Sequence, residues 1–408
     1  MLTGSPARVA SDVSDAATSR LQAIWRHQEL VIPIGIALIS RFVVLVAADL
    51  LMRFALVGRH HALPYTGPIA VWLRKDAGWY ISIAQHGYVD TPQAPYLHLR
   101  ANFFPLYPLL IHLVAQFFAL FPLAHPYAMA GMVISWITFV VACVGLYRLT
   151  SRLFGPSVAV GTTLLLAVFP YSLYYGAAYT EAPYLALVVW AFVCIERGQW
   201  WAAGALAGLA CAVRPPGLLV GACVALAYLL DWYLNYRPLR LNIMALALTP
   251  LGLFAYMFYC WARWGQPFAY VTASRAGWHG GHLQTGGLRF VAHVLVHTPS
   301  WLGTRDGNHL LDYFAILLML GFLALIPLVW RRLGPLYALF TLASVAAPIL
   351  DFSNANSLGR YLSVVFPVFM VVAFALRGRP RLLATLSVAS GVLLILFATY
   401  FVAGYGLS

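Results

Sequence analysis

The sequence predicts an all-α protein that crosses a membrane many times. Hydrophobic residues make up 62% of its 408 residues and charged residues only 9%, whereas about a quarter of the residues of a soluble domain are charged. Apolar stretches of the ~20 residues that a helix needs to cross a ~30 Å hydrocarbon core recur along the whole chain. The composition therefore excludes a water-soluble enzyme or a nucleic-acid-binding domain.

Apolar periodicity and helix-breaking residues predict about eleven spans. The predicted spans are 29–57, 127–148, 157–175, 180–196, 201–214, 217–234, 241–262, 311–330, 334–350, 361–376 and 382–403. Residues 1–28 are small and polar and lack the apolar core of a signal peptide, which predicts a disordered cytoplasmic tail. Residues 29–408 are then a single transmembrane domain.

Arginine-rich turns, which prefer the cytoplasmic side, predict the sidedness of the spans. These turns lie near residues 148–152, 197, 237–240, 331–332 and 377–381. They share one side with the N-terminus only if the segment 103–121, which contains prolines and His112, does not cross completely. We therefore expect a re-entrant or juxtamembrane helix there and an external C-terminus; a twelfth full span is the alternative. The large external loops are then 58–126 and 263–310.

The chain has only twelve carboxylates, and one of them stands out. Asp76 lies in the first external loop beside Lys75, the only lysine of the chain, and Trp79 and Tyr80 follow at helical spacing. This spacing predicts an amphipathic helix at the membrane interface. If Asp76 has only a structural role, we expect it to form an ion pair with Lys75 or Arg74 that anchors this helix. Asp49, inside the first span, has Arg53 at i+4 and is predicted to pair with it.

Arginines on the predicted external face need a separate explanation, because the charge rule disfavours cations there. Arg214, Arg275 and Arg360 are the clearest cases. A planar guanidinium matches the oxygens of a phosphate, so we predict a site for a lipid phosphate. Each arginine could instead bind backbone carbonyls at a helix end.

Other kinds of chemistry have weaker support in the sequence. The five cysteines lie in apolar segments without a CxxC pair, so they are predicted to be core residues. His279, His282, His293 and His297 have spacings that could hold zinc but lack an acidic or cysteine partner nearby. No P-loop, dinucleotide-binding glycine motif or serine-hydrolase elbow occurs. We expect no cofactor, and the single strong carboxylate disfavours a multi-acid site for a divalent metal.

Seven motifs, in order, resemble those of the PIG-V family of glycosyltransferases, which belongs to the GT-C superfamily. They are "RKDAGWYISIAQHGY" (74–88), "NFFPLYPLL" (102–110), "LYRLTSRLFGP" (146–156), "YTEAPYLAL" (179–187), "AGLACAVRPPGLLV" (207–220), "WGQPFAYVTASRAGW" (264–278) and "SLGRYLSVVFP" (357–367). The resemblance implies a GT-C fold and transfer of a hexose, usually mannose, from a polyprenyl phosphate to a lipid-linked or glycolipid acceptor at an external site. It also implies that Asp76 is the catalytic carboxylate, although Lys75 stands where the family commonly has tryptophan.

With this resemblance the candidate residues take roles. Asp76 would be the general base of an inverting transfer, and Arg214, Arg275 and Arg360 would bind the donor phosphate. Residues expected to contact sugar or acceptor are Lys75, Trp79, Tyr80, Tyr88, Phe104, Tyr107, Glu181 and Tyr361. A flippase or transporter of lipid-linked sugars, or a transferase of another sugar such as arabinofuranose, remains an alternative. We expect a multi-pass protein of the plasma membrane, or of the ER if the source is eukaryotic.

Overall fold

The computed structural model describes residues 6–56, 69, 72–90, 98–121, 123–234, 241–278, 308–351 and 357–404. Every regular element in these residues is a helix, and no strand occurs among them. The predicted all-α class is therefore confirmed.

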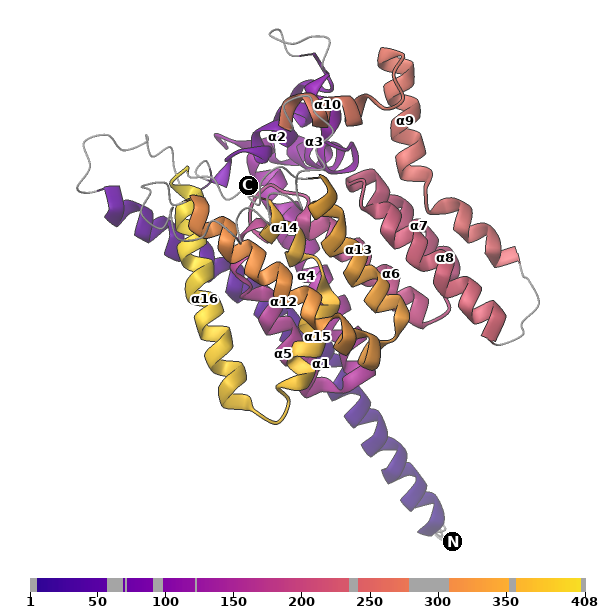
Figure 1. Cartoon of the computed structure of the whole chain (residues 1–408). Helices are drawn as coiled ribbons and strands as arrows, with labels where there is room; N and C mark the ends of the chain where they lie inside the picture. Colours follow the sequence, from indigo (N-terminus) through magenta and orange to yellow (C-terminus); the bar gives the residue numbers. More distant parts are fainter. Residues whose placement is uncertain are drawn as a thin grey trace.

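The long helices form one bundle (Figure 1). Its helices are α1 (Pro6–Leu56), α4 (Pro126–Phe154), α5 (Pro156–Ala167), α6 (Glu181–Glu196), α7 (Trp200–Val213), α8 (Gly217–Leu234), α9 (Leu251–Trp264), α12 (Asn308–Leu333), α13 (Pro335–Asp351), α15 (Phe366–Ala375) and α16 (Pro380–Val402). Shorter helices lie at one end of the bundle: α2 (Asp76–His86), η3 (Leu99–Asn102), α3 (Leu106–Phe118) and α10 (Ala269–Trp278). The predicted interface helix and partial helix correspond to α2 and α3.

Three predicted spans are broken by proline, which lacks an N–H group and clashes with the preceding helical turn. The span predicted at 157–175 divides into α5 and the 3-10 helix η4, which begins at Pro170 (Pro170–Tyr175). The span at 241–262 divides at Pro250 into η5 (Leu241–Leu248) and α9. The span at 361–376 divides into α14 (Leu358–Ser363) and α15, whose second residue is Pro367.

Helix length and hydropathy set how many helices can cross a membrane alone. Five of the described helices meet both criteria: Gln28–Phe54 within α1, α4, α8, Leu311–Leu333 within α12, and α16; the pair η5 and α9, bent by 45°, makes a sixth. Five others are apolar but shorter: α3, α5, α7, Pro335–Pro348 within α13, and α15. The multi-pass character is clear, while the count of eleven spans stays a prediction.

The N-terminal segment is part of the first helix of the structure. Residues 1–28 are predicted to be a disordered tail, but α1 already begins at Pro6. Proline suits the first turn of a helix because its missing N–H would be unpaired there anyway. No glycine or proline follows until Pro33, so the polar segment continues directly into the apolar span as one helix.

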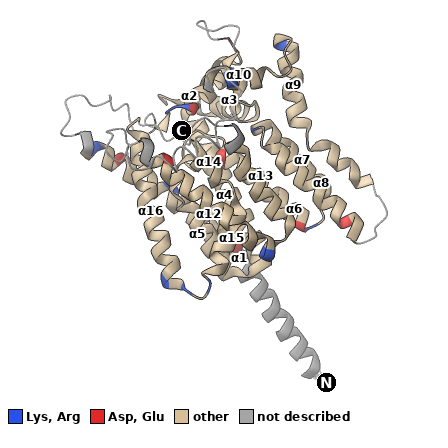
Figure 2. Ribbon diagram, in the orientation of Figure 1, with Lys and Arg blue, Asp and Glu red and all other residues tan. Residues whose placement is uncertain are grey.

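The two ends of the bundle differ in what they carry. In Figure 1, α2, α3 and α10 lie at the top, and the N-terminal end of α1 lies at the bottom. The turns between α12 and α13 and between α15 and α16, which follow or contain clustered arginines, also lie at the bottom (Figure 2). These two arginine-rich turns therefore lie at the end opposite α2, while residues 237–240 lie outside the described residues.

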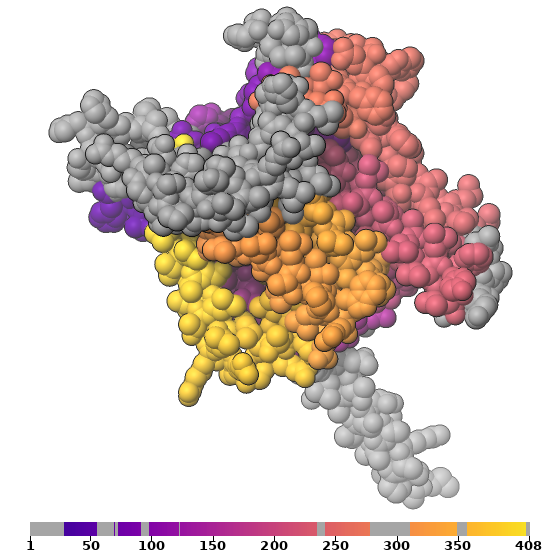
Figure 3. All heavy atoms as spheres, in the orientation of Figure 1, coloured from indigo at the N-terminus to yellow at the C-terminus, as the bar shows by residue number. Residues whose placement is uncertain are grey.

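Helices α4 and α6 form the centre of the bundle, and most of their residues are buried. Gly145 allows the close approach of the two helices, because a Cβ there would lie 2.8 Å from Trp190 Nε1. That nitrogen donates to the Val141 carbonyl at 2.9 Å. The C-terminal helices, orange and yellow in Figure 3, cover one face of this core.

Candidate active site

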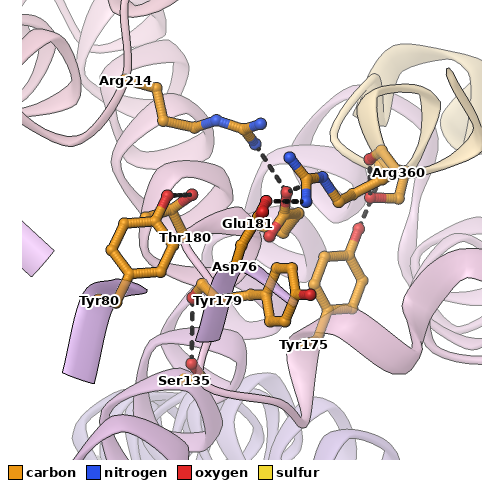
Figure 4. A network of polar contacts seen from close by, with 10 residues as sticks. Asp76, Tyr80, Ser135, Tyr175, Tyr179, Thr180, Glu181, Arg214 and Arg360 are labelled. Carbon is orange, nitrogen blue, oxygen red and sulfur yellow. Dashed lines mark hydrogen bonds and ion pairs between the residues drawn. The ribbon is translucent and has the colours of Figure 1, made fainter. Parts of the chain in front are cut away.

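Four charged side chains from four separate elements meet near the α2 end of the bundle (Figure 4). Arg360 Nη1 donates to Asp76 Oδ2 at 2.6 Å. Arg214 Nη1 donates to Glu181 Oε1 at 2.9 Å, and Arg360 Nε lies 2.9 Å from the same oxygen, without hydrogen-bond alignment. We call Asp76, Glu181, Arg214 and Arg360 the charged cluster. Sequence reasoning pairs Asp76 with its neighbours; the structure pairs it with Arg360, 284 residues away.

The local sequence fixes where each of these side chains begins. Asp76 and Glu181 are the first residues of α2 and α6, where the positive end of the helix dipole favours a carboxylate. Arg214 follows α7 with an extended backbone (φ −157, ψ 148), the conformation that a following proline imposes. Arg360 lies on α14, which ends before the proline break. Breaks in helices therefore bring the charges together.

Burial distinguishes the two carboxylates of the cluster. Glu181 is fully buried, and its Oε2 has no hydrogen-bond partner among the described residues. The Asp76 side chain is 19% exposed. Two guanidiniums on one buried carboxylate make Glu181 the fixed counter-ion, because a buried charge is tolerated only when it is paired. Asp76 is therefore the more exposed of the two acids.

Two of the aromatic residues expected to contact sugar or acceptor adjoin the cluster. The Tyr361 ring lies under the Arg214 guanidinium, with Cζ 4.6 Å from the ring centroid. The Tyr80 hydroxyl lies 3.3 Å from the hydroxyl of Thr180, the residue before Glu181. Burial raises the pKa of Tyr80 above its ordinary value, and the nearby Asp76 carboxylate raises it further. The phenol therefore stays protonated and can donate a hydrogen bond.

Three further candidates hold the loop helices in place. Trp79 stacks on Phe103, with ring centroids 5.7 Å apart, and the Tyr88 hydroxyl donates to the Phe103 carbonyl at 2.5 Å. The Tyr107 hydroxyl is fully buried and donates to the Gly131 carbonyl of α4 at 2.9 Å. These contacts join α2 to the chain before α3, and α3 to α4. They give Tyr88 and Tyr107 a supporting role.

Two other candidates lie outside the charged cluster. Phe104 is buried against Tyr256, with centroids 4.7 Å apart. Arg275 is exposed on α10 and takes no part in the contacts of Asp76, Arg214 or Arg360 among the described residues. The positions of the arginines along the sequence could not show that Arg275 lies apart from Arg214 and Arg360, because the packing of α10 decides where Arg275 lies.

The chain just before Asp76 is held in an unusual conformation. Lys75, the N-cap of α2, is exposed and has φ 57, a region that favours glycine. The preceding Arg74 is fixed at both ends: its carbonyl accepts the Tyr179 hydroxyl at 3.0 Å, and its Nη2 donates to the Val402 carbonyl at 3.3 Å. Anchored on both sides, this turn aims Asp76 at Arg360.

Tyrosines before Glu181 also belong to the site, and the sequence analysis does not single them out. The Arg360 guanidinium lies 5.7 Å from the ring centroid of Tyr174 and 5.4 Å from that of Tyr179. Aromatic faces stabilise a desolvated cation. The sequence "YSLYYGAAYTEAP", in which four tyrosines precede a lone acid, could have predicted that these tyrosines lie near the site.

Two other features bear on ligands. Among the described residues, no group of three His, Cys, Asp or Glu could hold a metal ion; His279, His282, His293 and His297 lie outside those residues. A groove of about 490 Å³ lies between α1 and α4, and its lining residues are all apolar: Leu38, Ile69, Met129, Met132, Val133, Trp136, Ile137, Val140 and Val141. Such a groove suits a hydrocarbon chain.

Comparison with known proteins gives this fold and site a context. The family described as mannosyltransferase (PIG-V) matches residues 63–277. GPI alpha-1,6-mannosyltransferase 2 of Cricetulus griseus is 27% identical over 277 residues, which cover 55% of this chain and 54% of that protein. The Mus musculus protein of the same name is 27% identical over 280 residues and covers 55% of each chain. This chain thus spans about half the length of the curated relatives that it matches.

A solved structure shares the fold over most of the chain. The crystal structure of ArnT from Cupriavidus metallidurans, bound to undecaprenyl phosphate, superposes with a TM-score of 0.53 at 16% identity, over 88% of this chain and 62% of that chain. The bundle thus has the fold of the GT-C membrane glycosyltransferases. The chain belongs to the PIG-V family of mannosyltransferases, because the family match covers more than half of it.

Proposed function

We propose that the protein transfers a hexose, most simply mannose, from a polyprenyl phosphate to a hydroxyl of a lipid-linked or glycolipid acceptor. The reaction inverts the anomeric centre and takes place at the α2 end of the bundle, on the external or lumenal face of the membrane. The placement of the arginine-rich turns at the opposite end supports this sidedness.

The observation that carries the proposal is the reachable Asp76 carboxylate, 2.6 Å from a guanidinium that is itself fixed on a buried acid. A transferase of this kind needs a base for the acceptor and cations for the leaving phosphate. Asp76 offers the first, and Arg360 and Arg214 offer the second within one site.

In the proposed reaction the acceptor oxygen attacks the anomeric carbon. The bond between that carbon and the phosphate oxygen breaks, and the polyprenyl phosphate leaves with the electron pair. Asp76 takes the proton of the acceptor hydroxyl. Phosphate is a good leaving group, so we propose that Arg214 and Arg360 supply the stabilisation without an acid catalyst or a metal ion.

The charge balance of the cluster indicates how the donor enters. Two carboxylates and two guanidiniums compensate one another before any ligand binds. An entering phosphate adds negative charge and needs a guanidinium donor. Asp76 is the more exposed acid, so we propose that the phosphate replaces it on Arg360. Asp76 Oδ2 is then released to face the acceptor hydroxyl, and donor binding precedes acceptor activation.

The test is transfer of tritiated mannose from polyprenyl-phosphate-mannose in proteoliposomes that contain a total lipid extract as the source of acceptor. Asp76→Asn keeps the shape of the side chain but removes the base, and we expect transfer to fall by about 10²–10⁴-fold. Asp90→Asn is the matched control, because Asp90 lies in the same loop and pairs with His98. Undiminished transfer by Asp76→Asn would refute the role of Asp76.

The alternatives give different results in the same assay. A transporter moves the labelled donor across the bilayer intact and labels no second lipid. A transferase of another sugar is inactive with the mannose donor and active with, for example, a polyprenyl-phosphate arabinofuranose donor.

A further inference from the structure

Arg41 is a buried cation in the middle of the first span and is not part of the charged cluster. It is 2% exposed. Its guanidinium donates to the Ser172 carbonyl, to the Ala167 carbonyl at 2.5 Å and to the Ser172 hydroxyl at 3.0 Å. It also lies over the Phe139 ring, 5.0 Å from the centroid. Among the described residues it forms no ion pair.

The break between α5 and η4 explains what Arg41 binds. Helix α5 ends at Ala167 and η4 begins at Pro170, so carbonyls at this point lack the N–H partners that a continuous helix would supply. Inside a membrane, water cannot replace those partners. Arg41, on another helix, donates to the Ala167 carbonyl at the C-terminus of α5, where a cation is favoured, and to the carbonyl and hydroxyl of Ser172 in η4. The position of η4 therefore depends on α1.

The segment η4 in turn holds the helix that carries Arg360. The Arg41 guanidinium lies 6.0 Å from the ring centroid of Tyr175, the last residue of η4. The Tyr175 hydroxyl donates to the Ser363 carbonyl at 2.7 Å, and the Ser363 hydroxyl donates to the Arg360 carbonyl at 2.6 Å. Figure 4 shows Tyr175 pointing toward the Arg360 segment. The backbone of α14 is thus tied to η4.

We infer that Arg41 is a positioning residue for the transfer: through η4 and Tyr175 it fixes α14, and so keeps the Arg360 guanidinium aligned between Asp76 and Glu181. The inference rests on the proposed function. An intramembrane charge marks a functional site by default because it is costly to bury. Here the charge serves the reacting groups indirectly, since Arg41 contacts none of them.

Two variants remove separate links of this connection. Arg41→Met removes the donors to η4 but keeps an unbranched side chain, and Tyr175→Phe removes only the hydroxyl that binds Ser363. For each we expect kcat to fall by about 10–100-fold, the cost of a small misplacement of reacting groups. Because both act through one connection, the double variant should be no slower than the slower single variant. Arg41→Lys, which keeps the charge but not the planar fork, should recover part of the rate.

The matched control is Arg53→Met, which removes an arginine of the same helix that pairs locally with Asp49. It should leave kcat and the donor KM unchanged and change the melting temperature only slightly, because an exposed i,i+4 pair contributes at most about 0.5 kcal/mol. Hydrogen exchange of residues 358–363 gives a readout independent of activity. Exchange should rise in Arg41→Met and Tyr175→Phe and stay unchanged in Arg53→Met.

The outcomes separate this inference from the proposed function. If the wild type transfers mannose while both variants keep its kcat, Arg41 does not position the site. Rate losses that only follow the melting temperature, or that multiply in the double variant, also overturn the inference. If the wild type transfers no sugar, the proposed function fails, and the exchange of residues 358–363 still decides whether Arg41 holds α14.

Discussion

Two Asp–Arg ion pairs of this protein differ in how they form: one joins neighbours on a single helix, and the other joins two helices that are distant in the sequence. Asp49 and Arg53 lie one turn apart on α1, with Arg53 Nε 2.9 Å from Asp49 Oδ2 and the Arg53 side chain 57% exposed. Asp76 and Arg360 lie 284 residues apart, and the Arg360 side chain is only 9% exposed. The first pair needs nothing but helical spacing, whereas the second exists only when α2 and α14 are brought together.

The difference shows why the charged cluster is a better candidate for function than the local pair. An exposed pair at i,i+4 contributes only about 0.3–0.5 kcal/mol and needs no other purpose. Burying several charges costs more than a well-packed apolar core of the same volume would. The protein nevertheless assembles them at the ends of four helices, where the Asp76 carboxylate stays partly exposed.

The largest effect on folding should come from the buried acid of the cluster. Glu181→Gln leaves two buried guanidiniums without their shared counter-ion, and we expect a loss of about 3–5 kcal/mol of stability. Glu196→Gln, at the other end of the same helix, keeps an oxygen that can accept the bond from the Tyr337 hydroxyl, now 2.8 Å long. It changes only a charged acceptor into a neutral one and should cost at most about 0.5–1.5 kcal/mol. Thermal unfolding in detergent measures both. Equal losses would mean that the cluster is no more coupled than a single hydrogen bond.

The two arginines should differ in what they do to the reaction. Arg360 contacts both acids, so Arg360→Lys should lower kcat by about 10²-fold through poorer stabilisation of the leaving phosphate. Arg214 contacts Glu181, and Arg214→Lys should raise the donor KM by about 10-fold with a smaller change in kcat. Donor titrations in proteoliposomes separate the two constants. If both variants change the same constant by the same factor, the two arginines do not have different roles in the reaction.

The smallest effect should come from the local pair on α1. Asp49→Asn removes a carboxylate whose partner is exposed, so we expect at most about 0.5 kcal/mol of stability and an unchanged rate of transfer. The measurements are the melting temperature and kcat, beside the double variant Asp49→Asn with Arg53→Met. A loss of activity would show that this pair also belongs to the site.

Several parts of the fold could be predicted because they depend on local patterns. The apolar runs located the helices of the bundle, and the spacing of Trp79, Tyr80 and Ile83 after Asp76 predicted α2 with its buried face. Elimination among the acids, together with the family motifs, selected Asp76. The proline breaks at 170, 250 and 367 were harder, because proline within an apolar run predicts either a kink or an end.

The site itself depends on contacts that no spacing encodes. From the sequence, Arg275 looked equivalent to Arg214 and Arg360, yet only the last two meet Glu181. Tyr88 and Tyr107 are predicted to contact sugar or acceptor, and the structure shows that their hydroxyls bond to backbone carbonyls. Arg41 carried no signal beyond being a charge inside a predicted span.

The sequence by itself determined the helical membrane class, the order of the helices, the end at which arginines gather and the acid that the family pattern singles out. The first three follow from interactions between a residue and its surrounding solvent or its neighbours within a turn, whereas the choice of the acid rests on the resemblance to the family. Tertiary structure alone decided that Asp76 pairs with Arg360, that Glu181 holds two arginines, and that Arg41 reaches η4. These contacts join residues more than 100 positions apart or at broken helix ends, where the packing of whole helices sets the distance between charges.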